Sequence, residues 1–360
     1  MYMTKLQVFG YKNHEESYFE FCSGINCITG PNGSGKTNIL DAVYYLGNAR
    51  SFFNAIDQQV VKHGSPAFSV HGWFSGETDA EILIHFNPEK GKKTIKKNGK
   101  TYPRILDHIG LIQTVFITPY DISLVLEGSE ERRRFLDFTL CQTNREYLEA
   151  LAFYKKIQEQ RNAYLKKCER TGIDEDILDS FDARLIPAAK KIHHCRMDFV
   201  KEFLPWFHEI HSYLSDKKDM VSLQYESELN DNDYANLLRQ NREKDRILMR
   251  TGSGIHKDDL LFFANDFPLK KFGSQGQIKT YVIALKLAQY RYYVEKTGHI
   301  PILLLDDIFE KIDARRADKL MELVAQEKFG QILITDTHAG RVKDHLETVG
   351  GEKRYFEIGE

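Results

Sequence analysis

The sequence predicts an α/β fold in which a discontinuous head is interrupted by a helical insertion. An apolar strand, a glycine-rich loop and a helix follow one another over residues 24–46, an order typical of an α/β core. Apolar strands that end in polar residues return near the C-terminal end of the chain. Between these parts, apolar side chains recur at the three- and four-residue steps of amphipathic helices. We therefore expect the head at 1–130 and 250–360, and the insertion at 131–249.

The composition is that of a soluble globular protein. The chain has 360 residues, of which 42% are hydrophobic and 28% charged, and its formal net charge is −2. It has no stretch of about eighteen apolar residues, which a membrane helix needs. Its five cysteines show no C-x-x-C spacing, which disfavours a zinc site. We expect a cytoplasmic protein without a membrane partner, in which any polyanion binds at a local basic patch.

The glycine-rich loop fits the pattern Gly-x4-Gly-Lys-Thr. Its residues are Gly30, Pro31, Asn32, Gly33, Ser34, Gly35, Lys36 and Thr37. In such loops backbone N–H groups surround the phosphates of a nucleotide, and the following helix adds a partial positive charge. Lys36 is expected to reach the outer phosphates from a solvent-accessible position, and the Thr37 hydroxyl to hold Mg²⁺. A glycine-rich turn that only caps a helix would look similar, but the strand at 24–29 and the helical spacing that follows favour ATP or GTP.

Extended segments flank this core. Residues 4–9, 18–21, 68–74, 80–86 and 94–97 predict an antiparallel sheet. The last segment is basic and is followed by Asn-Gly, which suits a hairpin turn. Its lysines are candidates for contact with nucleic-acid phosphates, although a solvated hairpin would carry the same charges. They are Lys92, Lys93, Lys96 and Lys97.

The insertion is expected to consist of long helices. Apolar residues at helical steps run through 177–203, where Pro187 should kink the helix or start a new one and Pro205 should end it. A second helix is predicted at 147–167 with its basic residues outside. These are Lys155, Lys156, Arg161, Lys166 and Lys167. Lys155 and Lys156 form a second candidate patch for nucleic acid, although such a face is also compatible with simple solvation.

A buried strand that ends in two carboxylates follows the insertion. The sequence returns to a strand at 258–263, a polar loop at 271–277 and a helix at 280–294. Next, the apolar strand at 302–305 leads to Asp306 and Asp307, which is the Walker B pattern.

The Walker B carboxylates have distinct expected roles. A parallel strand should deliver Asp306 beside Thr37 to bind Mg²⁺, and Asp307 should orient the attacking water. The final strand at 331–335 leads to His338, which either senses the γ-phosphate or is an ordinary surface histidine.

The order of these motifs resembles the ATP-binding-cassette (ABC) plan of the SMC-like ATPases, and further stretches resemble the RecF family of DNA replication and repair proteins. The RecF-like stretches span nearly the whole chain. They are Pro119 to Ser129, Arg132 to Asp137, Gln160 to Asn162, Ser274 to Gln277 and Asp306 to Phe309. The resemblance implies an ABC-type P-loop ATPase head with a flanking antiparallel sheet and a helical insertion domain.

The resemblance also implies a function and partners. It implies an ATP-dependent homodimer, formed head to tail, that binds double-stranded and gapped DNA and acts with RecO and RecR to bring RecA to gaps. Asp313 corresponds to the D-loop and His338 to the switch histidine. The signature that covers the partner's γ-phosphate is implied at Ser274, Gln275, Gly276 and Gln277. These roles imply a weak ATPase that DNA stimulates and that acts as a switch.

Three departures from the family pattern qualify the resemblance, one of which is Ile312 at the leucine position of the D-loop. The family's Gly-Pro-His-Arg-Asp-Asp is Gly254 to Asp259 here, with lysine at the arginine position, and the usual arginine after Ser-Phe is Phe53. Phe53 weakens any claim that this loop contacts phosphate, and lysine loses the planar fork of arginine. Asp307 replaces the glutamate of transporter cassettes. A shorter carboxylate lies farther from the γ-phosphate, so we expect slow hydrolysis.

Other functions fit the sequence less well. An ATPase fused to nuclease chemistry, as in the overcoming-lysogenisation proteins, needs an acidic metal-binding domain for which the chain after Asp307 leaves little room. A transporter cassette needs a membrane-coupling surface, which the helical insertion and the stretch at Arg132 to Asp137 disfavour. A purely structural SMC-like protein needs a long heptad coiled coil, and the sequence has none.

Overall fold

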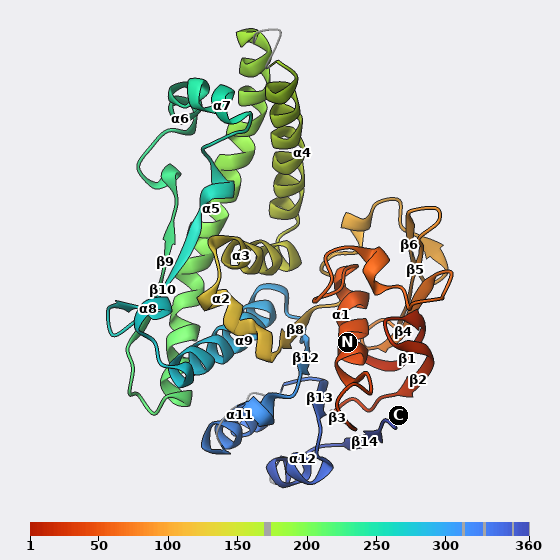
Figure 1. Cartoon of the computed structure of the whole chain (residues 1–360). Helices are drawn as coiled ribbons and strands as arrows, with labels where there is room; N and C mark the ends of the chain where they lie inside the picture. Colours follow the sequence, from red (N-terminus) through yellow and green to blue (C-terminus); the bar gives the residue numbers. More distant parts are fainter. Residues whose placement is uncertain (169–173, 312–313, 327–328, 348, 360) are drawn as a thin grey trace. The chain divides into compact units, whose positions relative to one another are not determined.

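The structure is a computed structural model that describes residues 1–168, 174–311, 314–326, 329–347 and 349–359 (Figure 1). Its contacts separate two compact units. The first contains Met1–Ile122, Tyr213–Lys217 and Lys279–Glu360, and the second Ser123–Ser212 and Lys218–Ile278. The predicted α/β class is confirmed, whereas the domain limits at residues 130 and 250 stay a prediction.

An antiparallel sheet of six strands forms one part of the first unit, as the alternating segments predicted. Its order is β2-β1-β4-β5-β6-β7. The strands are β1 (Tyr2–Tyr11), β2 (His14–Glu20), β4 (Phe68–Ser75), β5 (Ala80–Asn87), β6 (Lys92–Lys97) and β7 (Lys100–Thr101). In β4 and β5 every second residue is buried, so one face of the sheet packs on the core. Asn98 and Gly99 both have positive φ, as a type I′ hairpin turn requires.

A parallel sheet of five strands forms the other part of the first unit, in the order β14-β3-β13-β12-β8. The strands are β3 (Ile25–Thr29), β8 (Thr114–Ile117), β12 (Ile302–Leu305), β13 (Ile332–Asp336) and β14 (Lys353–Glu357). Every residue of β3, β8, β12 and β13 is buried. Because β3, β13 and β12 are parallel neighbours, their carboxyl ends lie along one edge of the sheet.

Helices of the first unit pack around these sheets. They are α1 (Lys36–Asn48), α10 (Ile308–Lys311), α11 (Ala314–Gln326), α12 (Ala339–Leu346) and most of α9 (Gln275–Thr297), with the short turns η1 (Asp57–Val60), η2 (Ile105–Asp107) and η3 (Pro119–Ile122). Helix α1 begins at the phosphate loop and buries all but two of its residues, Thr37 and Asn38. This burial fixes the direction in which the helix N-terminus points.

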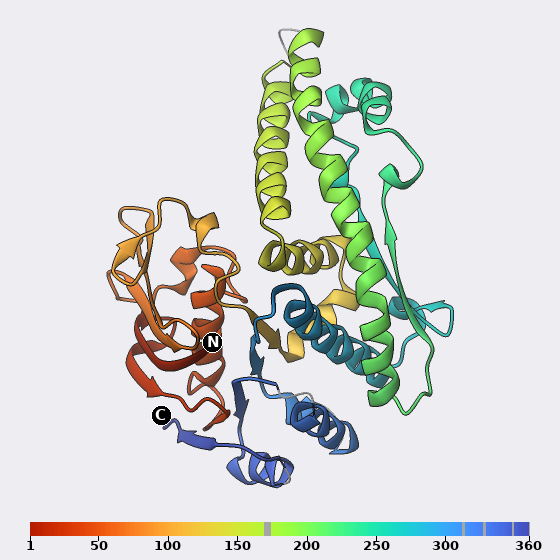
Figure 2. The same ribbon diagram turned by 180° about the vertical axis from the view of Figure 1, so that it is seen from behind.

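The second unit is mostly helical. Its helices are α2 (Ser123–Leu126), α3 (Ser129–Thr143), α4 (Arg145–Lys167), most of α5 (Glu175–Leu214), α6 (Tyr234–Gln240), α7 (Arg242–Leu248) and α8 (Leu269–Phe272), with the turns η4 (Glu228–Asn230) and η5 (Ile255–Lys257). A small antiparallel sheet, β11-β10-β9, accompanies them. It consists of β9 (Val221–Glu226), β10 (Asp259–Ala264) and β11 (Phe267–Pro268). Helices α4 and α5 run side by side in both views (Figures 1 and 2).

Two predictions about these helices are wrong. Helix α5 continues through Pro205 to Leu214, so this proline does not end it, and no new helix starts at Pro187, where a kink was the other predicted outcome. A proline costs about 3 kcal/mol inside a helix, and the burial of phenylalanines on both sides of Pro205, at Phe203 and Phe207, offsets that cost.

Within the described ranges, no helix is long and apolar enough to cross a membrane.

The other error concerns Arg161. We predicted this side chain on the outer face of α4, but it is fully buried. Its guanidinium pairs with Asp182 of α5 at 2.9 Å and with Asp245 of α7 at 2.7 Å. A buried charge is stable only with such partners, and they lie on other helices. Helical spacing alone therefore assigns this arginine to the wrong face.

Candidate nucleotide site

The phosphate loop lies between β3 and α1. At two of its positions, Gly30 and Gly35, neighbouring atoms leave no room for a side chain. A side chain at Gly30 (φ +158°) would place Cβ 2.3 Å from the carbonyl oxygen of Ile358. A side chain at Gly35 (φ +99°) would meet the side chains of Asn13 and His14 at 2.5 and 2.6 Å. The segment after β14 and the turn between β1 and β2 therefore hold the two ends of the loop in close contact.

Lys36 is buried, which corrects the prediction of a solvent-accessible side chain. Only 4% of its surface is exposed. Its Nζ donates hydrogen bonds to the carbonyl oxygens of Gly30 at 2.8 Å and of Pro31 at 2.9 Å. The side chain therefore folds back over its own loop and places a positive charge inside it. Phosphate oxygens are stronger acceptors for an ammonium group than neutral carbonyls are. The ammonium group of Lys36 is therefore suited to exchange the two carbonyl oxygens for phosphate oxygens.

The sequence prediction that Thr37 and Asp306 meet is consistent with the geometry at the end of β12. The Thr37 hydroxyl donates to Asp306 Oδ1 at 2.7 Å, and the Thr335 hydroxyl of β13 donates to the same oxygen at 2.8 Å. Burial, together with the neighbouring Asp307 carboxylate, raises the pKa of Asp306 to about 6 against the lowering effect of these hydrogen bonds. A hydroxyl and a carboxylate oxygen are ligands that Mg²⁺ prefers, and a cation would favour the ionised Asp306.

Asp307 has an unusual backbone conformation. Its φ is +44°, in the left-handed region that costs a non-glycine residue about 1 kcal/mol or more. Its N–H donates to the Thr335 hydroxyl at 3.0 Å, so Thr335 contacts both Walker B residues. Asp307 also lines a cavity of about 710 Å³, within the size range of small-molecule sites. The other lining residues include Lys12, Thr37, Asn38, Phe53, Tyr120 and Asp306.

His338 lies on a second cavity beside the phosphate loop. This cavity has a volume of about 670 Å³ and is lined by Thr29 of β3 and residues 30–32 of the loop, together with Thr337, His338, Ala339, Arg341 and Glu357. His338 is exposed at the start of α12, and its N–H donates to Asp336 Oδ1 at 2.8 Å. The phosphate loop therefore contributes residues to two cavities, one with the Walker B carboxylates and one with His338.

Sequence reasoning missed two side chains at this site. Lys12 pairs with the buried Asp41 at 2.7 Å and lies 4.9 Å from the centre of the Phe53 ring. His14 is buried, and its Nε2 lies 3.1 Å from the carbonyl oxygen of Gly35. Burial lowers the pKa of His14 below its ordinary value, which favours the neutral ring. Lys12 follows β1 and His14 begins β2, and neither belongs to a motif with a fixed spacing, so only the fold brings them to the loop.

The predicted signature lies in the second unit, at the N-terminus of α9. Ser274 N–H donates to Gln277 Oε1 at 2.9 Å, and Gln277 N–H lies 3.2 Å from Ser274 Oγ. This reciprocal pair is a capping box, so Ser274 caps the helix and Gln275 to Gln277 are helical rather than a loop as predicted. Ser274 and Gln275 are exposed. Asp313, the predicted D-loop residue, lies outside the described residues.

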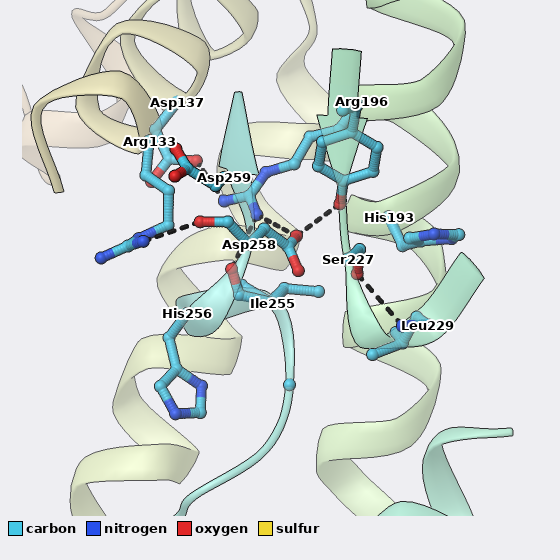
Figure 3. A network of polar contacts seen from close by, with 12 residues as sticks. Arg133, Asp137, His193, Arg196, Ser227, Leu229, Ile255, His256, Asp258 and Asp259 are labelled. Atoms are coloured by element: carbon cyan, nitrogen blue, oxygen red, sulfur yellow. Dashed lines mark hydrogen bonds and ion pairs between the residues drawn. The ribbon is translucent and has the colours of Figure 1, made fainter. Parts of the chain in front are cut away.

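A network of polar contacts connects the RecF-like stretch at Arg132 to Asp137 with Arg196 and Asp258 (Figure 3). Arg196 of α5 is 1% exposed and pairs with Asp137 at 2.7 Å and Asp258 at 2.5 Å. Arg133 donates to the carbonyl oxygen of Asp258 at 2.7 Å. The prediction that at least one arginine of 132–134 turns inward is confirmed. The network joins α3, α5 and the residue before β10, so the buried charge of Arg196 has partners on other elements of the unit.

The candidate nucleic-acid lysines differ in their surroundings. Lys92 and Lys96 are exposed on β6, and Lys155 and Lys156 are exposed on α4. Lys93, however, pairs with Asp57 at 2.7 Å and donates to the carbonyl oxygen of Ala49 at 2.6 Å. The positive charge of Lys93 is therefore already paired with a carboxylate of the first unit.

Comparison with known proteins adds independent findings. The family model described as RecF/RecN/SMC N terminal domain matches residues 2–354. The chain is 43% identical to the DNA replication and repair protein RecF of Flavobacterium johnsoniae, covering 99% of this chain and 100% of the relative. It is 40% identical to the protein of the same name from Bacteroides thetaiotaomicron, covering 99% and 97%.

Comparison with solved structures also indicates the RecF fold. The structure of the recombination mediator protein RecF-ATPrS in the RecFOR pathway has a TM-score of 0.88 and 28% identity, covering 99% of this chain and 96% of that chain. The Smc head domain from Pyrococcus furiosus has a TM-score of 0.54 and 18% identity, covering 96% and 91%. The second similarity concerns the fold alone.

Proposed function

Because the chain belongs to the RecF family, we propose that it is an ATP-dependent DNA-binding protein of recombinational repair and replication. It binds gapped DNA at junctions of double and single strands and helps to load recombinase. The relatives' shared name and the pathway named for a solved structure support this function. The observation that carries the ATP-dependent part is the hydrogen bond from the Thr37 hydroxyl to Asp306, because it joins the phosphate loop to the Walker B strand.

Each residue of the nucleotide site has a separate task in this proposal. The backbone N–H groups of residues 30–35 and the N-terminus of α1 bind the phosphates. Lys36 exchanges its carbonyl partners for the outer phosphate oxygens. Thr37 and Asp306 hold Mg²⁺, which supplies charge neutralisation at the phosphates when it is bound. The donor set fits Mg²⁺, since both groups present hard oxygen atoms.

Hydrolysis is assigned to Asp307, assisted by His338. Asp307 orients the attacking water, and its position on the cavity that also contains Thr37 and Asp306 supports this role. His338 interacts with the γ-phosphate from the second cavity, which residues 30–32 of the loop also line. The reaction is slow, because the aspartate is shorter than the glutamate of transporter cassettes, and DNA stimulates it.

ATP also controls assembly. Two chains associate head to tail, and Ser274, Gln275, Gly276 and Gln277 of one chain cover the γ-phosphate bound by the other. The exposure of Ser274 at a helix N-terminus supports this role, because a helix N-terminus favours an anion. ATP thus favours the dimer and hydrolysis releases it. RecO and RecR are the partners that the pathway name suggests.

Sedimentation velocity of the purified protein tests this function. The protein alone should sediment as a monomer, ATP with Mg²⁺ should produce a dimer, and gapped duplex DNA should bind the dimer more tightly than the monomer. Intact duplex and single-stranded DNA of equal length serve as controls. Equal binding of gapped DNA with and without ATP would contradict the proposal.

A further inference from the structure

The buried hydroxyl of Thr335 on β13 contacts both Walker B residues. Thr335 is 0% exposed. Its hydroxyl donates to Asp306 Oδ1 at 2.8 Å and accepts a hydrogen bond from the N–H of Asp307 at 3.0 Å. A hydroxyl has one hydrogen and two lone pairs, so a single group can make both bonds at once. One side chain therefore holds the carboxylate of Asp306 and the backbone of Asp307.

The register of the parallel sheet explains why Thr335 reaches the end of β12. Leu305, the last residue of β12, pairs with Ile334 of β13. Thr335 is the next residue of β13, so it lies beside the point where β12 ends and the Walker B residues begin. The contact with Asp306 spans 29 positions of the sequence, and no motif spacing marks it.

The contact with Asp307 holds an unfavourable backbone conformation. The φ of Asp307 is +44°, in a region that residues other than glycine adopt infrequently. Such conformations persist where the surrounding structure fixes them, and they are typical of functional sites. The backbone conformation of Asp307 sets the direction in which its side chain leaves the chain, and this residue lines the cavity that also contains Thr37 and Asp306.

Thr335 differs from Thr37, although both hydroxyls donate to Asp306 Oδ1. Thr37 lines the cavity, and the proposed function assigns it to Mg²⁺. Thr335 is fully buried and is not among the described residues that line this cavity. Its hydroxyl is therefore suited to act on a bound nucleotide through the two aspartates rather than by direct contact.

We infer that Thr335 is a positioning residue for ATP hydrolysis, whose hydroxyl holds Asp307 in the backbone conformation that directs its carboxylate toward the attacking water. The same hydroxyl fixes Asp306 Oδ1. The inference rests on the proposed function, which assigns hydrolysis to Asp307, and adds the residue by which the neighbouring strand controls that carboxylate. Loss of the hydroxyl should therefore affect turnover much more than nucleotide affinity.

Thr335→Val tests this role, because valine keeps the branched shape of threonine but can neither donate nor accept a hydrogen bond. ATP turnover at saturation should fall at least tenfold, while the affinity for the slowly hydrolysed analogue ATPγS stays within threefold of the parent. Thr335→Ala removes the same hydroxyl without a methyl group against the carboxylate and should show the same split. Thr335→Ser keeps the hydroxyl and should restore turnover to within threefold of the parent.

Thr114→Val on β8 is the matched control. Thr114 is as buried as Thr335, and its hydroxyl accepts a hydrogen bond from the Asn48 side chain at 3.0 Å. It pairs with Ile302, the first residue of β12, and therefore lies at the edge of the sheet opposite to Asp306. This variant also loses a buried hydrogen bond, but its turnover should match that of the parent. An equal loss of turnover in Thr114→Val would show that any buried hydroxyl of this sheet matters as much.

Amide hydrogen exchange of the nucleotide-free protein gives a readout that does not depend on hydrolysis. The Asp307 N–H loses its acceptor in Thr335→Val, so it should exchange at least tenfold faster than in the parent or in Thr114→Val. Nuclear magnetic resonance measures this single amide. Unchanged exchange would show that Thr335 does not hold the backbone of Asp307.

Asp307→Asn separates failure of the inference from failure of the proposed function. If Asp307→Asn loses turnover but Thr335→Val and Thr335→Ala keep it, Thr335 is not a positioning residue and the role of Asp307 stands. If Asp307→Asn turns over ATP like the parent, the proposed function itself is wrong about the catalytic carboxylate. In the double variant, Thr335→Val should lower turnover no further than Asp307→Asn alone, because the two residues act as one unit. Independent, multiplied losses would contradict this route. Thermal melting checks that each variant is folded.

Discussion

Lys36 shows how far a motif predicts a single side chain. The spacing of the phosphate loop indicates its role, but its burial depends on where the loop carbonyls point, which the spacing does not specify. With its ammonium group on the carbonyl oxygens of Gly30 and Pro31, the side chain ties the start of the loop to the start of α1. Lys36 therefore contributes to the loop's shape as well as to nucleotide binding.

Lys36→Met should abolish ATP binding or its productive use and leave the fold intact. Methionine fits the buried position, and removal of the two hydrogen bonds costs about 1–3 kcal/mol of stability. Equilibrium binding of a fluorescent ATP analogue, ATP turnover and circular dichroism measure the three quantities. Normal ATP affinity together with normal turnover would show that the loop is not the nucleotide site.

Asp307→Asn should separate binding from hydrolysis. Asp306 and Thr37 remain to hold Mg²⁺, so ATP should bind, but the charge that orients water is lost. The variant should accumulate as an ATP-bound dimer with turnover reduced at least tenfold. Phosphate release and sedimentation measure the two effects, with Asp344→Asn on α12 as a control. Turnover within twofold of the parent would exclude Asp307 as the catalytic carboxylate.

The limits of sequence reasoning at the element scale have physical causes. Strand β14 is mostly exposed, so it lacks the apolar run by which β12 and β13 were recognised, and β8, although as short and as buried as β12, leads into no carboxylate motif that marks it. The helical insertion was recognised because its period is sustained, but α5 crosses two prolines since burial on both sides offsets their cost. The candidate site was predicted where a motif fixes the spacing. Lys12 and His14 reach it only through sheet pairing.

The contact of η5 with α4 should make stability depend on pH. His256 Nε2 lies 3.0 Å from the carbonyl oxygen of Thr251, and its Nδ1 lies 2.9 Å from the hydroxyl of Tyr154. Burial lowers the pKa of His256 from 6.5 to about 4, and the nearby Lys257, Arg133 and Arg196 add to the effect. The neutral ring therefore stabilises the fold above pH 6.5, and this contribution is lost as the pH falls toward 4.

His256→Asn should remove this dependence, because an amide can keep one donor and one acceptor without titrating. Between pH 7 and 5 the parent should lose about 2 kcal/mol more unfolding free energy than the variant, by linkage from the two pKa values. Urea unfolding at both pH values measures the difference. Equal losses in the two proteins would show that folding does not lower the pKa of His256.

Strand β6 carries the first candidate DNA surface. Replacing Lys92, Lys96 and Lys97 by alanine should weaken DNA binding and flatten the dependence of log K on log salt by about 0.9 for each DNA phosphate that the variant no longer neutralises. Lys93 is left in place because it pairs with Asp57. Lys155→Ala/Lys156→Ala on α4 is the comparison. A salt slope unchanged in the β6 variant and reduced in the α4 variant would move the site to α4.

At the scale of the whole molecule, the nucleotide loop and the signature belong to different compact units. One chain can therefore have an intact loop and a damaged signature, or the reverse. This separation allows the composite nature of the proposed active site to be tested with mixed dimers.

Ser274→Arg should bind ATP normally as a monomer, fail to dimerise and lose hydrolysis, because the bulky side chain blocks closure. Mixed with Lys36→Met, it should regain at most one working site, in which its own intact loop meets the partner's intact signature. ATP turnover of the mixture, compared with each variant alone, measures this recovery. No recovery at any mixing ratio, with both variants folded, would contradict the shared site.

The strand order of the parallel sheet has a consequence for synthesis of the protein. Strand β3, which leads into the phosphate loop, pairs only with β13 and β14 among the described strands, and the nearby hydrogen bond from Met3 to Gln331 spans 328 positions. The loop's strand therefore emerges from the ribosome long before either neighbour exists. The second unit is nearly continuous in sequence and can fold during that interval. We expect nascent chains to gain nucleotide affinity only after β14 has emerged, so that ATP binding marks the end of folding.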